Sequence, residues 1–155
     1  MMRHRKFVCA LGVFMIAGTA VAAGMTGAEA VKARQAHMKA LGASEKILVE
    51  QIHSGAPSMA VFKVEAAKID DAAKTLPTWF PVGSGPSSGA KTKALPLIWT
   101  DPAGFADKQK ALSVAAAKFD AATEAGDPAA VGPALREVGA ACKGCHDTYK
   151  AKDKT

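Results

Sequence analysis

The chain has 155 residues, a length that suits one domain built around a single hydrophobic core. Its formal net charge of +6 comes from 20 basic and 14 acidic residues, but no run of Lys and Arg is interleaved with aromatic residues, so nucleic-acid binding gains little support. Beyond the N-terminal segment no stretch approaches the ~20 uninterrupted apolar residues of a transmembrane helix, and we expect no membrane span in the mature protein.

The N-terminal segment has the features of a signal peptide. Three basic residues come first, residues 7–21 form an apolar run, and small residues then supply a cleavage site. We expect residues 1–22 to be a signal peptide, with cleavage after Ala22 or Ala23, and residues 23–155 to form the exported domain. The mature chain then keeps 17 basic residues against 14 acidic ones, a net charge of about +3.

The mature part is predicted to be all-α, because it is rich in Ala, Lys, Leu, Val and Glu and lacks the alternating β-branched residues of strands. Apolar residues recur at helical spacing in a first helix over residues 26–53 and in a second that begins after Pro57 and ends at Pro77. The side chains expected to face the core are Val31, Met38, Leu41, Leu48 and Ile52 in the first helix, and Met59, Phe62, Ala66, Ile69, Ala73 and Leu76 in the second.

A long connection follows the second helix. Residues 79–101 include a stretch that is too rich in Gly, Pro and Ser for regular structure. We expect a crossover loop here, held down by apolar side chains that include Trp79, Phe80 and Trp99.

Two further helices are predicted after this loop, each starting at an Asp-Pro pair that supplies an N-cap and a first helical residue. The third helix begins at residues 101–102 and runs to about Ala125, and the fourth begins at residues 127–128. Four helices of about 20 residues, joined by short turns and one long crossover loop between the second and third, indicate an antiparallel four-helix bundle.

The last helix carries the most informative motif, Cys-Lys-Gly-Cys-His at residues 142–146. Cys142, Cys145 and His146 are related as i, i+3 and i+4, so both thiols and the imidazole project from one helix face. We interpret the motif as a covalent c-type haem site, in which the thiols form thioethers with the haem vinyl groups and His146 is the axial ligand of the iron.

Other interpretations of the motif fit less well. A redox CxxC pair normally opens a helix after a strand, and a zinc site needs a second pair of ligands, whereas His37 and His53 stand alone far upstream. A disulfide would leave His146 unexplained. Because no nucleophile with its base and no carboxylate pair rises above background, we do not expect an enzyme of another class.

Three segments of the chain resemble the class II cytochromes c of the cytochrome c′ group. They are Arg34-Gln35 with Met38 four residues after the arginine, residues 97–105 (Leu-Ile-Trp-Thr-Asp-Pro-Ala-Gly-Phe), and residues 138–147 around the Cys-Lys-Gly-Cys-His motif. They occur in the same order and at the same separations as in that group, so the resemblance covers essentially the whole mature chain.

The resemblance implies a periplasmic protein with one covalently attached haem c per chain and a homodimer packed through its first two helices. It also implies that Arg34 and Gln35 lie close to the haem propionates and that Trp99 packs beside the haem. A plain core or loop anchor is the alternative for Trp99, and the two roles are compatible. A guanidinium can bind a carboxylate with two hydrogen bonds, which fits the expected role of Arg34. Relatives commonly have an arginine four residues after the haem histidine, where this chain has Lys150.

Met38 separates two possible functions. If its thioether only fills space above the iron, the haem is five-coordinate and high-spin and binds NO and CO. If the thioether ligates the iron, the protein is a six-coordinate low-spin electron carrier with an unidentified redox partner. We favour the first, because the segments around Arg34 and residues 99–102 look more like those of five-coordinate relatives. His37 points about 100° away from Met38 on the helix and is expected to face solvent.

Overall fold

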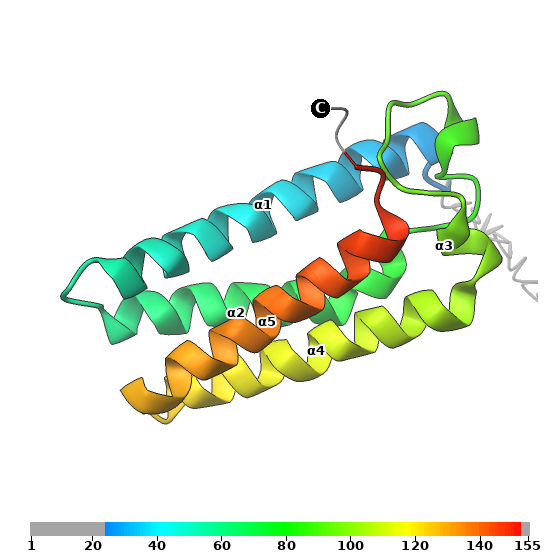
Figure 1. The fold of residues 1–155 in the computed structure, drawn as a ribbon. Helices are drawn as coiled ribbons and strands as arrows, with labels where there is room; N and C mark the ends of the chain where they lie inside the picture. Colours follow the sequence, from blue (N-terminus) through cyan, green and yellow to red (C-terminus); the bar gives the residue numbers. More distant parts are fainter. Residues whose placement is uncertain (1–23, 153–155) are drawn as a thin grey trace, which may run out of the picture.

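The computed structural model describes residues 24–152 and confirms an all-α bundle (Figure 1). The expected signal peptide lies outside the described residues. The four long helices are α1 (Gly27–His53), α2 (Met59–Thr75), α4 (Pro102–Glu124) and α5 (Pro128–Tyr149). None of the described helices is both long and apolar enough to cross a lipid bilayer.

The connection between α2 and α4 holds more regular structure than we expected. It contains two 3₁₀ helices, Leu76–Trp79 and Pro86–Ser88, and the one-turn helix α3 (Leu97–Thr100). α2 therefore ends just before Pro77, but the chain continues as a 3₁₀ helix. Pro77 fits there because the N–H groups in the first turn of a helix make no hydrogen bond within that helix.

The helix starts follow the capping residues of the sequence. The Asp101 side chain accepts a hydrogen bond from the Gly104 N–H (3.1 Å), and Asp127 accepts one from the Ala129 N–H (2.9 Å). Both helices therefore begin where the Asp-Pro pairs predicted. At the start of α1, Thr26 and Glu29 form a capping box that satisfies the first N–H groups.

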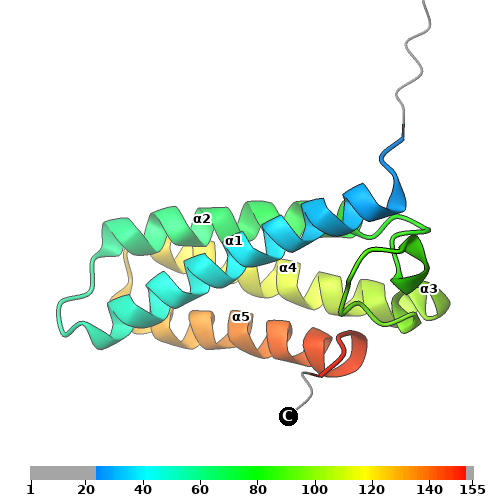
Figure 2. The ribbon, with the colours of Figure 1, turned by 90° about the horizontal axis from the view of Figure 1, so that it is seen from above.

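The bundle is closed on three of its four sides. α1 packs along α2, α2 along α4 and α4 along α5, whereas α1 and α5 make few direct contacts. Seen from above (Figure 2), α1 crosses the bundle obliquely and diverges from α5 toward the end where the α2–α4 connection lies. The residues that position the functional site are found on this fourth, open side.

Most of the predicted core positions are buried. The side chains buried in α2, α4 and α5 include Phe62, Ala66, Ile69, Ala73, Leu112, Ala116, Phe119, Leu135 and Val138. The prediction for Ile52 is wrong, since 42% of this residue is exposed. Each four-residue step on a helix turns the side chain by about 40°, and Ile52 lies in the last turn of α1, one such step beyond the fully buried Leu48.

Candidate haem-binding site

A cavity of about 640 Å³ lies on the open side of the bundle, between α1 and α5. This volume falls in the range of about 300–1,000 Å³ that is usual for small-molecule and cofactor sites. The apolar part of its wall is formed by Met38, Leu41, Ile69, Leu76, Phe80, Ile98, Phe105, Leu112 and Val138. All four long helices and the α2–α4 connection contribute to the wall, so the cavity is a product of the whole fold.

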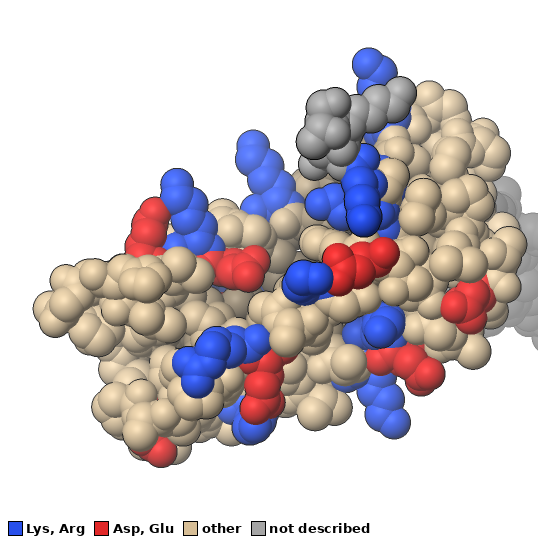
Figure 3. Space-filling view, in the orientation of Figure 1, with Lys and Arg blue, Asp and Glu red and all other residues tan. Residues whose placement is uncertain are grey.

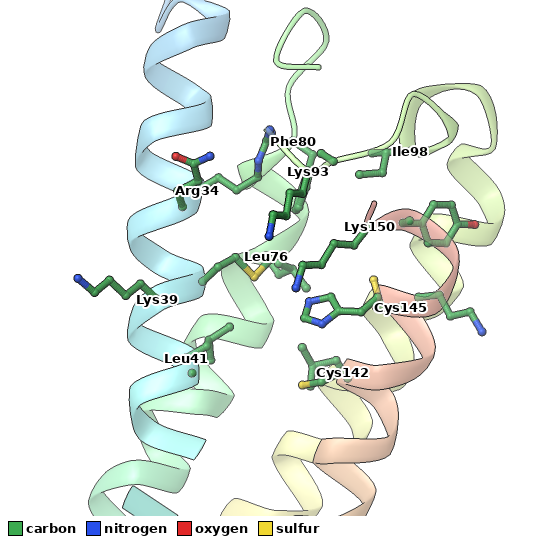
Figure 4. A pocket seen from close by; sticks show the side chains of 18 of the residues that line it. Arg34, Lys39, Leu41, Leu76, Phe80, Lys93, Ile98, Cys142, Cys145 and Lys150 are labelled. Carbon is green, nitrogen blue, oxygen red and sulfur yellow. The ribbon is translucent and has the colours of Figure 1, made fainter. Parts of the chain in front are cut away.

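The structure brings Cys142, Cys145 and His146 together at this cavity. Both cysteines are half-buried free thiols, and Figure 4 shows them on the side of α5 that faces α1. Burial raises the pKa of Cys142 to about 11 and also raises the pKa of Cys145. Burial, followed by the nearby charge of Lys150, lowers the pKa of His146, which favours the neutral imidazole that can ligate a metal.

Arg34 lines the same cavity from α1 and is almost fully buried. Its guanidinium donates hydrogen bonds to the Ser84 hydroxyl (3.0 Å), the Ser84 carbonyl (2.9 Å) and the Thr92 hydroxyl (3.1 Å), and it lies over the Phe80 ring at 4.7 Å. Burial lowers the pKa of Arg34, but an arginine stays charged in proteins. Among the described residues no carboxylate pairs with this buried cation, so its site favours an anionic ligand group.

Further polar side chains line the cavity. Gln35 donates from Nε2 to the carbonyl of Lys91 (2.8 Å), which fastens the connection to α1. In Figure 4 the side chains of Lys93 and Lys150 reach into the space between α1 and α5. The other charged residues of the lining are Lys39, Lys91, Lys108 and Glu45.

This set of groups fits a haem. The apolar wall suits the flat face of the macrocycle, and the excess of cations suits two propionate carboxylates. Two thiols three residues apart, followed at once by an imidazole, match the groups that attach a c-type haem and ligate its iron.

Met38 is among the lining residues, but Trp99 is not. The Trp99 indole N–H donates to the carbonyls of Phe80 and Pro81 at 3.2 Å each, and its ring packs so closely on Gly85 that a Cβ there would lie 3.0 Å from the ring. These contacts describe the loop anchor that the sequence left open as an alternative. They do not show Trp99 at the cavity wall.

The other two histidines within residues 24–152 behave as predicted. His37 and His53 are exposed, and neither lines the cavity. The His37 ring stacks on Trp79, with centroids 4.5 Å apart.

Sequence reasoning missed a cluster that closes one end of the cavity. The Tyr149 hydroxyl donates to Asp101 Oδ2 at 2.6 Å, and the Phe105 ring packs edge-on against Tyr149 (5.1 Å) and Phe80 (4.9 Å). This hydrogen bond raises the pKa of Tyr149 to about 12 and lowers that of Asp101. Gly104 leaves room for this hydrogen bond, because a Cβ there would lie 2.6 Å from the tyrosine oxygen, but the glycine alone does not reveal the contact in the sequence.

Comparison with known proteins gives one family. The cytochrome C′ family profile matches residues 29–150. Cytochrome c′ of Rubrivivax gelatinosus is 44% identical over 70 residues, and there the chain spans only about half (54%) of the relative's length. Cytochrome c′ of Alcaligenes xylosoxydans xylosoxydans is 33% identical over 129 residues, which are 80% of this chain and 94% of the relative.

Solved structures agree with the sequence comparisons. The crystal structure of cytochrome c′ from Rubrivivax gelatinosus has a TM-score of 0.74 at 31% identity and covers 81% of this chain and 97% of that one. A nitric oxide complex of a cytochrome c prime variant from Alcaligenes xylosoxidans has a TM-score of 0.74 at 29% identity, with coverages of 83% and 98%.

Proposed function

The chain belongs to the cytochrome c′ family, whose members carry covalently attached haem c, and we propose that Cys142, Cys145 and His146 hold this haem in the cavity between α1 and α5. One observation carries the proposal. Both thiols and the imidazole line a single apolar cavity whose lining also includes a buried arginine without a carboxylate partner among the described residues. His146 is proposed as the axial ligand, and the two thiols as the points of attachment.

Arg34 and Gln35 are proposed to bind the haem propionates. The propionates are carboxylates, which are the partner that the buried guanidinium lacks. Both side chains are already fixed by hydrogen bonds to the α2–α4 connection, so little side-chain entropy is lost when the carboxylates bind. The connection therefore orients the two polar groups before the cofactor enters.

The proposed activity is the binding of NO or CO by a five-coordinate haem, as a gas-binding protein and not as an enzyme. A bound haem would supply an iron that can take up a diatomic gas, and this chain places the apolar side chains of Met38 and Leu41 on the α1 side of the cavity. The N–H groups of Arg34 and Gln35 are shared between the connection and, in this proposal, the propionates, so they offer little hydrogen bonding to a bound gas. Such a pocket favours NO and CO over O₂, and the nitric oxide complex solved for a relative supports the assignment.

A second function rests on Met38, whose thioether lines the same cavity as His146. If the sulfur ligates the iron, the protein is a low-spin electron carrier. The optical and EPR spectra of the ferric and ferrous protein, with and without CO, distinguish the two. A high-spin ferric signal and a Soret shift with CO support gas binding. A low-spin signal with a sulfur-to-iron charge-transfer band and no response to CO supports the carrier.

The variant M38L sharpens this test. It leaves the high-spin spectrum in place if Met38 only fills space, and it abolishes the charge-transfer band if Met38 is a ligand. M59L is the matched control, because Met59 packs against the core from α2 and does not line the cavity.

We also propose that the protein is exported to the periplasm and forms a homodimer through α1 and α2. The N-terminal segment supports export, and the intact mass of the mature protein checks cleavage after Ala22 or Ala23. Three exposed apolar side chains, Val49 and Ile52 of α1 and Val64 of α2, support an interface on these helices.

A further inference from the structure

One carboxylate lines a cavity whose other charged groups are cations. Glu45 of α1 is the single acidic residue of the lining, and its side chain is exposed. Within residues 24–152 the Glu45 carboxylate forms no hydrogen bond and no ion pair. Its negative charge is therefore not neutralised by a directly bonded lysine or arginine.

Glu45 lies at the narrow end of the cavity, where α1 comes closer to α5 (Figure 2). It stands 11 residues after Arg34 on the same helix, which places it about 16 Å farther along the helix axis. A Cβ at Gly139 of α5 would lie 3.7 Å from Glu45 Oε1, so the carboxylate reaches across to α5. Because Gly139 precedes Cys142 by about one helical turn, Glu45 lies beside the start of the Cys-Lys-Gly-Cys-His motif.

The charge of Glu45 acts on residues of the motif. Burial is the main cause that raises the pKa of Cys142, and the charge of Glu45 is the next. Burial and then the charge of Lys150 lower the pKa of His146, whereas Glu45 acts in the opposite direction. Figure 3 shows acidic and basic side chains intermingled over this face of the molecule, so no large field of one sign covers it. The charges nearest the motif therefore matter most.

We propose that Glu45 lowers the reduction potential of the haem, because it places an unpaired negative charge beside the proposed attachment site. The inference rests on the haem site proposed above. Reduction transfers one electron from an external reductant to the ferric iron, with no covalent bond made or broken, so the net charge of the site falls by one. A nearby carboxylate opposes this fall through Coulomb repulsion and favours the ferric state.

The test measures the reduction potential of the holoprotein in a spectroelectrochemical titration. E45Q removes the charge and keeps the shape of the side chain, whereas E45K reverses the charge. E50Q is the matched control, because Glu50 is an exposed carboxylate of the same helix that does not line the cavity. The mass of the denatured protein gives the covalent haem content of every sample.

We expect E45Q to raise the equilibrium constant for reduction about threefold, which corresponds to a shift of about 28 mV at 59 mV per tenfold change for one electron. The effect is modest because water and salt screen an exposed carboxylate. E45K changes the charge by two units and should raise the constant by about tenfold. E50Q should stay within about 1.3-fold of the wild type.

Four results would overturn the proposal. An unchanged potential in E45Q that carries one covalent haem per chain would show that the charge does not act on the haem, and would leave the haem site itself intact. Equal shifts in E45Q and E50Q would mean that net charge alone acts. Equal shifts in E45Q and E45K would mean that packing between α1 and α5 acts instead of charge. A wild type without covalent haem would overturn the haem site, and this inference with it.

Discussion

The α2–α4 interface and the α1–α5 side of the bundle are built from the same kind of helix and packed in opposite ways. Between α2 and α4, fully buried Ala66 and Ala116 let the helices approach closely, and Phe119 fills the space beside them. On the α1–α5 side, Met38, Cys142 and their neighbours line a cavity. One interface is therefore packed shut, whereas the other leaves a cavity.

The comparison also explains why the α2–α4 connection is long. An open side without support would let α1 drift away from the bundle, because α1 has little direct contact with α5. The connection closes this end: Arg34 bonds to Ser84 and Thr92, while the backbone of Leu95 donates to the carbonyl of Tyr149 (3.0 Å). It thus joins α1 to α5 without filling the cavity.

The largest expected effect is the loss of the cofactor from the open side. In C142A/C145A no thioether can form, so we expect covalent haem to fall from one per chain to none, as measured by the mass of the denatured protein. K143A is the control within the motif, since the Lys143 side chain bonds to Asp147 and does not line the cavity. A haem adduct in the double variant would disprove attachment through these thiols.

Truncating a side chain at the closed α2–α4 interface is expected to cost the most stability. F119A removes a fully buried ring and should lower the free energy of unfolding by about 3–5 kcal/mol. M38A, compared in the haem-free chain, should cost less than half as much, because Met38 already borders a cavity and leaves little new void. Urea unfolding of both variants measures the difference. Similar losses would mean that the open side is packed as tightly as the closed one.

Two glycines of α1 differ in their surroundings: Gly27 packs against the α2–α4 connection, and Gly42 lies in the middle of the helix. A Cβ at Gly27 would lie 2.2 Å from the carbonyl oxygen of Gly83, so G27A should push α1 away from the connection and lower the melting temperature. A Cβ at Gly42 meets no atom within 4 Å. In the haem-free chain G42A should therefore stabilise the protein by about 0.5–1 kcal/mol through helix propensity alone. Calorimetry of the two variants should give shifts of opposite sign.

The clamp between Tyr149 and Asp101 makes the closed end of the cavity sensitive to acid. The hydrogen bond from Tyr149, then that from Gly104, lowers the pKa of Asp101 below its usual value. Its contribution to stability is therefore complete above about pH 4, the value in the unfolded chain, and is lost as pH falls through the lower folded value.

D101N keeps a capping side chain but cannot titrate, and it should lose less stability than the wild type between pH 6 and pH 3. Y149F removes the larger cause of the shift and should reduce the same pH dependence. Chemical denaturation at several pH values measures both. An unchanged pH profile in both variants would show that the clamp does not contribute.

The smallest effect on folding is expected at the proposed dimer interface. V64K places a charge on the exposed face of α2 and should change the stability of the subunit by no more than about 0.5 kcal/mol. If α1 and α2 form the homodimer, it should nevertheless halve the mass measured by light scattering. V114K, on the similarly exposed Val114 of α4, should leave the mass unchanged. Loss of the dimer in V114K but not in V64K would contradict an interface through α1 and α2 and would place it on α4.

Local chemistry determined what the sequence could reveal by itself. Helical periodicity and the Asp-Pro pairs gave the four helices and their starts, because capping depends on residues a few positions apart. The spacing of Cys142, Cys145 and His146 placed all three on one face, which holds for any helix. Ile52 shows the limit of this reasoning, since each four-residue step turns the side chain by about 40° and the last step carried it off the buried face.

Only the tertiary structure decided how the helices are spaced and what surrounds the motif. The partners of Arg34 lie 50 or more residues away in the connection, the partner of Tyr149 lies 48 residues away, and the Trp99 indole bonds to the carbonyls of Phe80 and Pro81. These contacts depend on the path of an irregular segment, which no local rule fixes. The divergence of α1 from α5, and with it the cavity, follows from such long-range contacts and is invisible in the pattern of any one helix.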